Sequence, residues 1–278
     1  MKIKIRGVRG SIPTADPDTT YYGGNTSCIE VEEEGWRLVL DAGSGMRYSN
    51  TGERPDNKRI DILLTHLHLD HIIGLGFFQP LFDPAMEIHI WGPASSKQSL
   101  HSRLTRYLSP PLFPVLIRNL PCKLTLHEID NTEFKIGPFT VQSEYVIHPG
   151  PTIGYRITGH HSVFVYLPDH EPALGRTGML TDPRWISGIR LAKGADILLH
   201  DAQYTREEYP FRTGWGHSSM DDALHFATMA GVKHLLLAHH DPDHSDATLN
   251  EMFSALQTRH NNPIHHELAV EGMELELP

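Results

Sequence analysis

Residues 60–71 read IDILLTHLHLDH, and this stretch decides the fold. An apolar run typical of a buried strand leads directly into the pattern H-x-H-x-D-H. His66 and His68 are two positions apart, so they face the same side of an extended chain. Asp70 and His71 begin a turn or helix from which they face a second ion. Imidazole and carboxylate ligands suit Zn²⁺, Mn²⁺ or Fe, so the stretch predicts a metal centre.

The composition of the chain indicates which class of protein carries this metal centre. The 278 residues, 39% of them hydrophobic, are enough for a substantial core. No apolar run approaches the roughly 20 residues that cross a bilayer, and residues 1–6 resemble a first strand and not a signal peptide. Cys28 and Cys122 are the only cysteines, so no disulfide framework exists and we expect a cytoplasmic protein.

Charge and histidine content point away from a nucleic-acid binder and toward metal. The formal net charge is −10, and lysine and arginine never form a run, whereas phosphate binding usually needs a basic face. The chain holds 20 histidines and no terminal histidine tag, about three times average usage. Many of them follow apolar runs, where ligands are expected.

Short apolar strands alternate with loops and a few helices along the whole chain. Predicted strands cover residues 2–6, 28–32, 37–40, 60–64, 87–91, 123–127, 139–146, 154–157, 162–167, 197–200 and 234–238. Predicted helices cover residues 96–107, 219–230 and 247–258. We interpret residues 1–278 as one domain of two packed sheets flanked by helices.

The H-x-H-x-D-H pattern resembles that of the metallo-β-lactamase superfamily, which implies an α+β fold, the four-layer αββα sandwich. Two glycine-rich stretches, residues 7–13 (GVRGSIP) and 22–28 (YGGNTSC), are similar to bacterial and phage cyclic-nucleotide phosphodiesterases in its ribonuclease Z-like branch. Glycine turns of this kind also let the backbone approach a metal cleft closely.

The resemblance implies the remaining ligands, one at a time. Asp41, in VLDAGSG, would orient a ligand without binding metal. His148 would join His66 and His68 on one ion. Asp169 would bridge to a second ion held by Asp70, His71 and His239, with His240 as the alternative to His239. His170 stands where threonine or serine is usual, and it is either a neighbour of the ligands or exposed.

A further match concerns catalysis. Residues 195–202 (ADILLHDA) and 216–219 (GHSS) resemble the H-E-A and G-H-S-T patterns of ribonuclease Z-like enzymes. By this match His217 would be the general acid and Asp201 its orienting partner, with aspartate in place of the usual glutamate. A hydroxide between two metal ions, Zn²⁺ by preference and Mn²⁺ or Fe otherwise, would be the nucleophile. Asp70 would serve both as a ligand and in catalysis.

The substrate expected is a small phosphodiester such as a cyclic nucleotide. Ribonuclease Z holds tRNA with a long arm inserted between the positions matched by His148 and Asp169, which are 21 residues apart here. We therefore expect no nucleic-acid partner and no membrane partner, and the resembled group implies a homodimer.

Several other functions share parts of the pattern. A glyoxalase II-type thioester hydrolase has the same ligand types, and a tRNA 3′-processing endonuclease has the same catalytic match. A flavodiiron oxidoreductase normally carries glutamate at the position of His68, and many β-lactamases carry cysteine at that of Asp169. A non-catalytic metal-binding or nucleotide-binding module is the alternative outside the enzymes.

Overall fold

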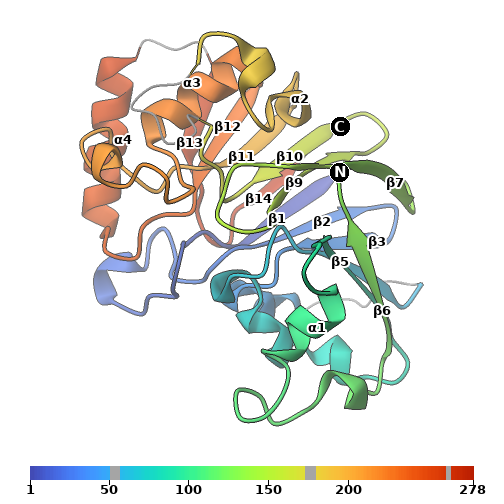
Figure 1. The fold of residues 1–278 in the computed structure, drawn as a ribbon. Helices are drawn as coiled ribbons and strands as arrows, with labels where there is room; N and C mark the ends of the chain where they lie inside the picture. The colour runs from blue at the N-terminus through green and yellow to red at the C-terminus, as the bar shows by residue number, and fades with distance from the viewer. Residues whose placement is uncertain (51–56, 173–179, 261–263) are drawn as a thin grey trace.

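Two mixed β-sheets lie face to face, and helices cover the outer face of each sheet (Figure 1). The computed structural model describes residues 1–50, 57–172, 180–260 and 264–278. The first sheet has the order β14 (Glu274–Glu276), β1 (Lys2–Gly7), β2 (Cys28–Glu33), β3 (Trp36–Leu40), β4 (Arg59–Leu63), β5 (Glu87–Pro93) and β6 (Lys123–Ile129). The second has the order β13 (His265–Leu268), β12 (His234–Ala238), β11 (Ile197–Asp201), β10 (Val163–Leu167), β9 (Ile153–Thr158), β8 (Phe139–Tyr145) and β7 (Thr132–Ile136).

The helices are short, apart from two. The α-helices are α1 (Leu100–Thr105), α2 (Ile189–Ala192), α3 (Met220–Ala230) and α4 (Asp246–Arg259). The 3₁₀-helices are η1 (Pro17–Thr19), η2 (Ser44–Asn50), η3 (Leu69–His71), η4 (Ile73–Phe77), η5 (Gln79–Phe82), η6 (Ile117–Asn119), η7 (Pro183–Trp185) and η8 (Tyr209–Phe211). In the described parts of the chain, no helix is long and apolar enough to span a membrane.

Parallel pairing brings the ends of several strands to one edge. Strands β3 to β6 pair in parallel in the first sheet, and β10 to β13 do so in the second. Because the carboxyl ends of parallel strands meet at the same edge of a sheet, the loops that follow them can build one site. The chain after β4, β10 and β12 carries six of the seven predicted ligands, and β11 ends at Asp201. The seventh, His148, follows the antiparallel strand β8.

Three apolar layers hold the sandwich together. Side chains of both sheets, among them Ile5, Tyr155 and Leu236, form the layer between the sheets. Leu224 of α3 belongs to the layer outside the second sheet, and Leu104 of α1 to the layer outside the first. This arrangement confirms the predicted four-layer sandwich.

All eleven predicted strands are present, with ends shifted by one or two residues. The predicted helix over residues 96–107 was too long, since α1 begins only at Leu100. Ser99 caps it, its side chain accepting a hydrogen bond from Ser102 N. Strands β7, β13 and β14 were not predicted.

Cys28 and Cys122 are both free and buried.

Candidate metal centre

The H-x-H-x-D-H loop begins where β4 ends, and a buried carboxylate holds it in place. Thr65 N donates to Asp41 Oδ1 at 2.7 Å, and Tyr166 OH donates to Asp41 Oδ2 at 3.0 Å. His71 Nδ1 lies 2.8 Å from Asp41 Oδ2. A carboxylate can only accept, so this nitrogen carries the proton and leaves Nε2 of His71 free. Asp41 therefore orients His71, as a neighbour of a metal ligand does.

His66, His68, His148 and Asp169 form the first cluster, with ligand atoms all within 4.8 Å of one another. His148 Nε2 lies 3.1 Å from His68 Nδ1 and 3.6 Å from Asp169 Oδ2. His66 Nε2 lies 3.7 Å from the same carboxylate oxygen. His148 Nδ1 lies 2.8 Å from Gly216 O, and a carbonyl only accepts, so Nε2 turns its lone pair toward the cluster.

Asp70, His71 and His239 form the second cluster. His71 Nε2 lies 3.2 Å from Asp70 Oδ2 and 3.0 Å from Asp169 Oδ1. His239 Nδ1 lies 3.4 Å from Asp169 Oδ1. The two oxygens of Asp169 thus face different clusters, and its carboxylate lies between them. The structure brings together all seven side chains that the sequence singled out.

Several buried nitrogen and oxygen atoms of these residues make no hydrogen bond, which bears on whether the residues suit metal ions. His66 Nε2, His71 Nε2, Asp169 Oδ1 and both ring nitrogens of His239 are buried and make no hydrogen bond within the described structure. Such atoms are costly to bury unless something satisfies them. They converge on one place and are of the types that bind divalent transition metals. The residues therefore fit a pair of metal ions.

Charge at the centre suits a cation as well. Burial raises the pKa of Asp169, but the surrounding histidines outweigh burial and hold it well below the usual value. Burial lowers the pKa of His66 well below its usual range and that of His148 to about 4. Burial also lowers the pKa of His71, but the carboxylates of Asp169, Asp70 and Asp41 outweigh burial and raise it well above its usual value. An ionised carboxylate surrounded by imidazoles is a donor set for a divalent cation, and a protonated imidazole must lose its proton to bind one.

His217 lies beside the two clusters, and Asp201 holds it. His217 Nδ1 lies 2.7 Å from Asp201 Oδ2 and 4.0 Å from Asp169 Oδ2. Asp201 Oδ1 accepts from Ser218 N at 3.0 Å, which fixes the carboxylate. Burial lowers the pKa of His217, but the carboxylates of Asp201 and Asp169 outweigh burial and raise it to about 9.

Two glycines allow the ligands to come together. A Cβ atom at Gly10 would lie 2.4 Å from His239 Cδ2, and one at Gly216 would lie 2.4 Å from His148 Nδ1. Gly216 also has a φ of +90°, which favours glycine. The glycine-rich opening of the chain does approach the centre closely, at Gly10.

The two histidines left open by the sequence lie away from the clusters. His240 Nε2 contacts Ala269 O at 3.0 Å, and its ring faces Tyr22. His170 is fully buried, and its ring nitrogens contact His200 Nε2 at 2.9 Å and Ser187 Oγ at 2.8 Å. His239 is therefore the histidine of its pair that lies at the centre, and His170 is a buried neighbour of Asp169.

Other contacts at the centre were not predicted. Glu171 is buried, and its carboxylate accepts from Gly214 N at 2.7 Å and Gly216 N at 2.9 Å, which fixes the backbone before His217. Ser11 N donates to Asp70 Oδ2 at 2.9 Å. The only sequence signal for Glu171 is its place two residues after Asp169, whereas Ser11 lies in the glycine-rich stretch 7–13, whose backbone was expected to approach the centre.

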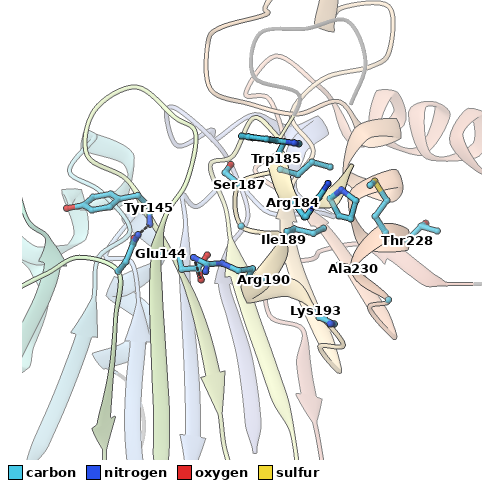
Figure 2. Close-up of a pocket in the computed structure, with 16 residues that line it drawn as sticks. Glu144, Tyr145, Arg184, Trp185, Ser187, Ile189, Arg190, Lys193, Thr228 and Ala230 are labelled. Atoms are coloured by element: carbon cyan, nitrogen blue, oxygen red, sulfur yellow. Dashed lines mark hydrogen bonds and ion pairs between the residues drawn. The ribbon is translucent and has the colours of Figure 1, made fainter. Parts of the chain in front are cut away.

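A cavity of about 750 Å³ lies beside Glu144 and Tyr145, at the end of β8 (Figure 2). Trp185, Ser187 and Arg190 are among the residues that line it. Arg190 Nη2 lies 3.1 Å from Glu144 Oε1, so its charge is already paired. None of the lining residues described belongs to the seven that form the two clusters.

Comparison with known proteins identifies the family. Residues 36–240 match the beta-lactamase superfamily domain, so the chain belongs to that superfamily. Ribonuclease Z of Lactococcus lactis (strain IL1403) is 26% identical over 310 aligned positions, which cover 94% of this chain and 96% of the relative. The name of this relative agrees with the resemblance to the ribonuclease Z-like branch.

Solved structures share the fold over essentially the whole chain. The metallo-beta-lactamase fold protein YhfI from Bacillus subtilis superposes with a TM-score of 0.70 at 21% identity, covering 99% of this chain and 98% of that one. The short form of human tRNase Z has a TM-score of 0.68 at 21% identity and full coverage of both chains. The protein is a metal-dependent hydrolase, as predicted, and its fold family implies divalent metal ions.

Proposed function

We propose that the protein is a phosphodiesterase that holds two divalent metal ions, Zn²⁺ by preference, and cleaves a small phosphodiester such as a cyclic nucleotide. The position of Asp169 carries the proposal. Its two oxygens face the two ligand clusters, and His217 Nδ1 lies 4.0 Å from one of them. A pair of ligand clusters with an adjacent histidine–carboxylate pair is an arrangement that suits phosphodiester cleavage.

Different side chains bind the metal ions and donate the proton. His66, His68 and His148 would hold one ion, and Asp70, His71 and His239 the other, with Asp169 between them. When bound, two such ions lower the pKa of a water molecule and offset charge on phosphate oxygens. The water oxygen forms the new bond to phosphorus as the bond to the leaving oxygen breaks. His217 donates its Nε2 proton to that leaving oxygen, and Asp201 keeps the ring oriented through Nδ1.

A short hairpin favours a small substrate. Strands β9 and β10 pair antiparallel between His148 and Asp169, and Gly159 N donates to Ser162 O in the turn between them. The structure describes residues 148–169 throughout, and they contain this hairpin and no inserted arm. The alignment with the Lactococcus relative is longer than this chain, 310 positions against 278 residues, so that relative carries insertions that are lacking here.

A second candidate is an endonuclease that processes the 3′ end of tRNA. The names of the relatives, ribonuclease Z and tRNase Z, favour it, and they weigh against the prediction that nucleic acid is not a partner. The net charge of −10 weighs against a phosphate-binding face.

A hydrolysis screen separates these functions. The enzyme, loaded with Zn²⁺ or Mn²⁺, is given cyclic mononucleotides, bis(p-nitrophenyl) phosphate, a tRNA precursor with a 3′ trailer, and S-lactoylglutathione. We expect turnover of cyclic nucleotides and of bis(p-nitrophenyl) phosphate. Preferential cleavage of the tRNA precursor would establish the second candidate, and turnover of the thioester alone would overturn both.

The role of His217 is tested with two leaving groups. The His217→Ala variant should lower kcat for a cyclic nucleotide about 10²-fold or more, because the ribose oxygen leaves poorly without a proton. The loss should be smaller for bis(p-nitrophenyl) phosphate, whose leaving group is a stable anion. Metal content, measured by mass spectrometry of the digested protein, should not change. Equal losses on both substrates would remove the role of proton donor.

A further inference from the structure

Three metal-binding side chains lie at the start of strands β12 and β13, away from the centre described above. The parallel register pairs His234 with His265 and Leu236 with Glu267. Residues two apart on a strand share a face, so His265 and Glu267 lie on the same face, and His234 lies opposite His265. Strand β13 is the edge of the second sheet, which leaves this group accessible from solvent.

The ligand atoms of these residues lie close enough for one ion. One nitrogen or oxygen from each residue lies within 4.8 Å of the others, and the rings of His234 and His265 are 4.1 Å apart between centroids. His234 Nε2 lies 2.8 Å from Glu267 Oε1. The His234 Nε2 atom is buried, and this carboxylate oxygen is the acidic group next to it.

We propose that His234, His265 and Glu267 form a separate binding site for a Zn²⁺-class ion. Two imidazoles and one carboxylate are a known Zn²⁺ ligand set that keeps an open position for water. Imidazole ligands favour Zn²⁺ and its transition-metal neighbours over Mg²⁺ and Ca²⁺, which prefer oxygen. The bound ion would fasten the edge strand β13 to β12.

This site is distinct from the centre at Asp169. Strand β12 begins at His234, and His239 follows its last residue. Five residues of extended chain span about 16 Å, too far for one ion to bind at both places. The proposal therefore stands whether or not the proposed phosphodiesterase activity is correct.

Zinc titration of the loaded enzyme tests the proposal. Protein that already holds its catalytic metals is titrated with Zn²⁺ by calorimetry, and metal content is measured after dialysis. We expect one further equivalent in the wild type and none in the His265→Ala variant, with at least tenfold weaker binding in Glu267→Gln. Mg²⁺ should not bind at this site. His265 is exposed, so its replacement should not disturb folding.

A matched control removes another exposed histidine. His160 Nε2 lies 3.1 Å from Glu34 Oε1, and His160→Ala should keep the additional equivalent. Added Zn²⁺ should raise the Tm of the wild type and of His160→Ala, but not that of His265→Ala, and all three should hydrolyse bis(p-nitrophenyl) phosphate at the same rate. The proposal is overturned if His265→Ala retains the equivalent, or if binding requires two copies of the chain, seen as a doubled mass in sedimentation.

Discussion

Asp41 shows how a residue that binds no metal sets the orientation of one that does. Its carboxylate contacts His71 Nδ1 and accepts from Thr65 and Tyr166. Thr65 Oγ1 in turn lies 3.1 Å from His66 Nδ1. Because this hydroxyl already donates to Asp41, it accepts from His66. Both histidines thus have their Nε2 atoms free for metal.

Asp41→Asn should weaken metal binding 10- to 100-fold, because the amide no longer holds the imidazole as a carboxylate does. The measurement is competition of the purified protein against a zinc indicator. Asp61→Asn is the matched control. Asp61 is also buried and accepts from Arg59 and Trp91, so its loss should cost stability but leave metal affinity unchanged. Equal affinity losses in both variants would mean that Asp41 acts only through stability.

At this scale, residue spacing predicts which side chains come together only where they directly follow a strand. His66, His68, Asp70 and His71 lie where their pattern predicted them. The sequence left His240 as the alternative to His239, since both follow the same apolar strand. What separates them is the backbone of His239, with a φ of +61°, together with the close approach of Gly10. Neither property follows from residue spacing.

Helix α3 connects the element scale to the site, because it begins directly after His217 and Ser218. Ser219 caps it by accepting from Asp222 N at 3.1 Å. Ser245 caps α4 in the same way, accepting from Thr248 N at 3.1 Å. The two caps are chemically alike, but only one adjoins the predicted general acid.

Ser219→Ala and Ser245→Ala should each lower the free energy of unfolding by about 1 kcal/mol, the usual cost of losing an N-cap. Only Ser219→Ala should also lower kcat, because the start of α3 fixes the chain next to His217. Urea denaturation and steady-state kinetics measure the two effects. An equal change in kcat for both variants would indicate that activity follows overall stability.

The unpredicted strands share a physical cause. β13 (HHEL) and β14 (ELE) are short and polar, and each lies at the edge of its sheet. β7 (TEFKI), also an edge strand, has only one buried residue. Edge strands bury little, so their sequences carry little apolar pattern and depend on pairing with a neighbour. Central strands such as β4, β10 and β11 bury both faces, and their apolar runs predicted them.

Over the whole molecule, the candidate metal centre joins the two sheets. His66, His68, Asp70 and His71 follow a strand of the first sheet, whereas Asp169 and His239 follow strands of the second. Ions bound between them would hold the halves of the sandwich together. Without ions, buried polar atoms such as His66 Nε2 and His71 Nε2 make no hydrogen bond in the described structure.

Chelation should therefore lower the stability of the folded protein. An ion present at 100 times its Kd adds about 2.7 kcal/mol per site. For a chain of this size each ion then raises the Tm by roughly 5–10 °C, and two ions raise it by about twice as much. The His265→Ala background removes the separate site at β13, so that only the centre at Asp169 contributes. Calorimetry with and without EDTA measures the shift.

Asp169→Asn in the His265→Ala background should have a low Tm that EDTA leaves unchanged, because its two clusters have lost their shared carboxylate. If EDTA does not change the Tm of the His265→Ala protein, the proposal that metal ions hold the two sheets together is wrong.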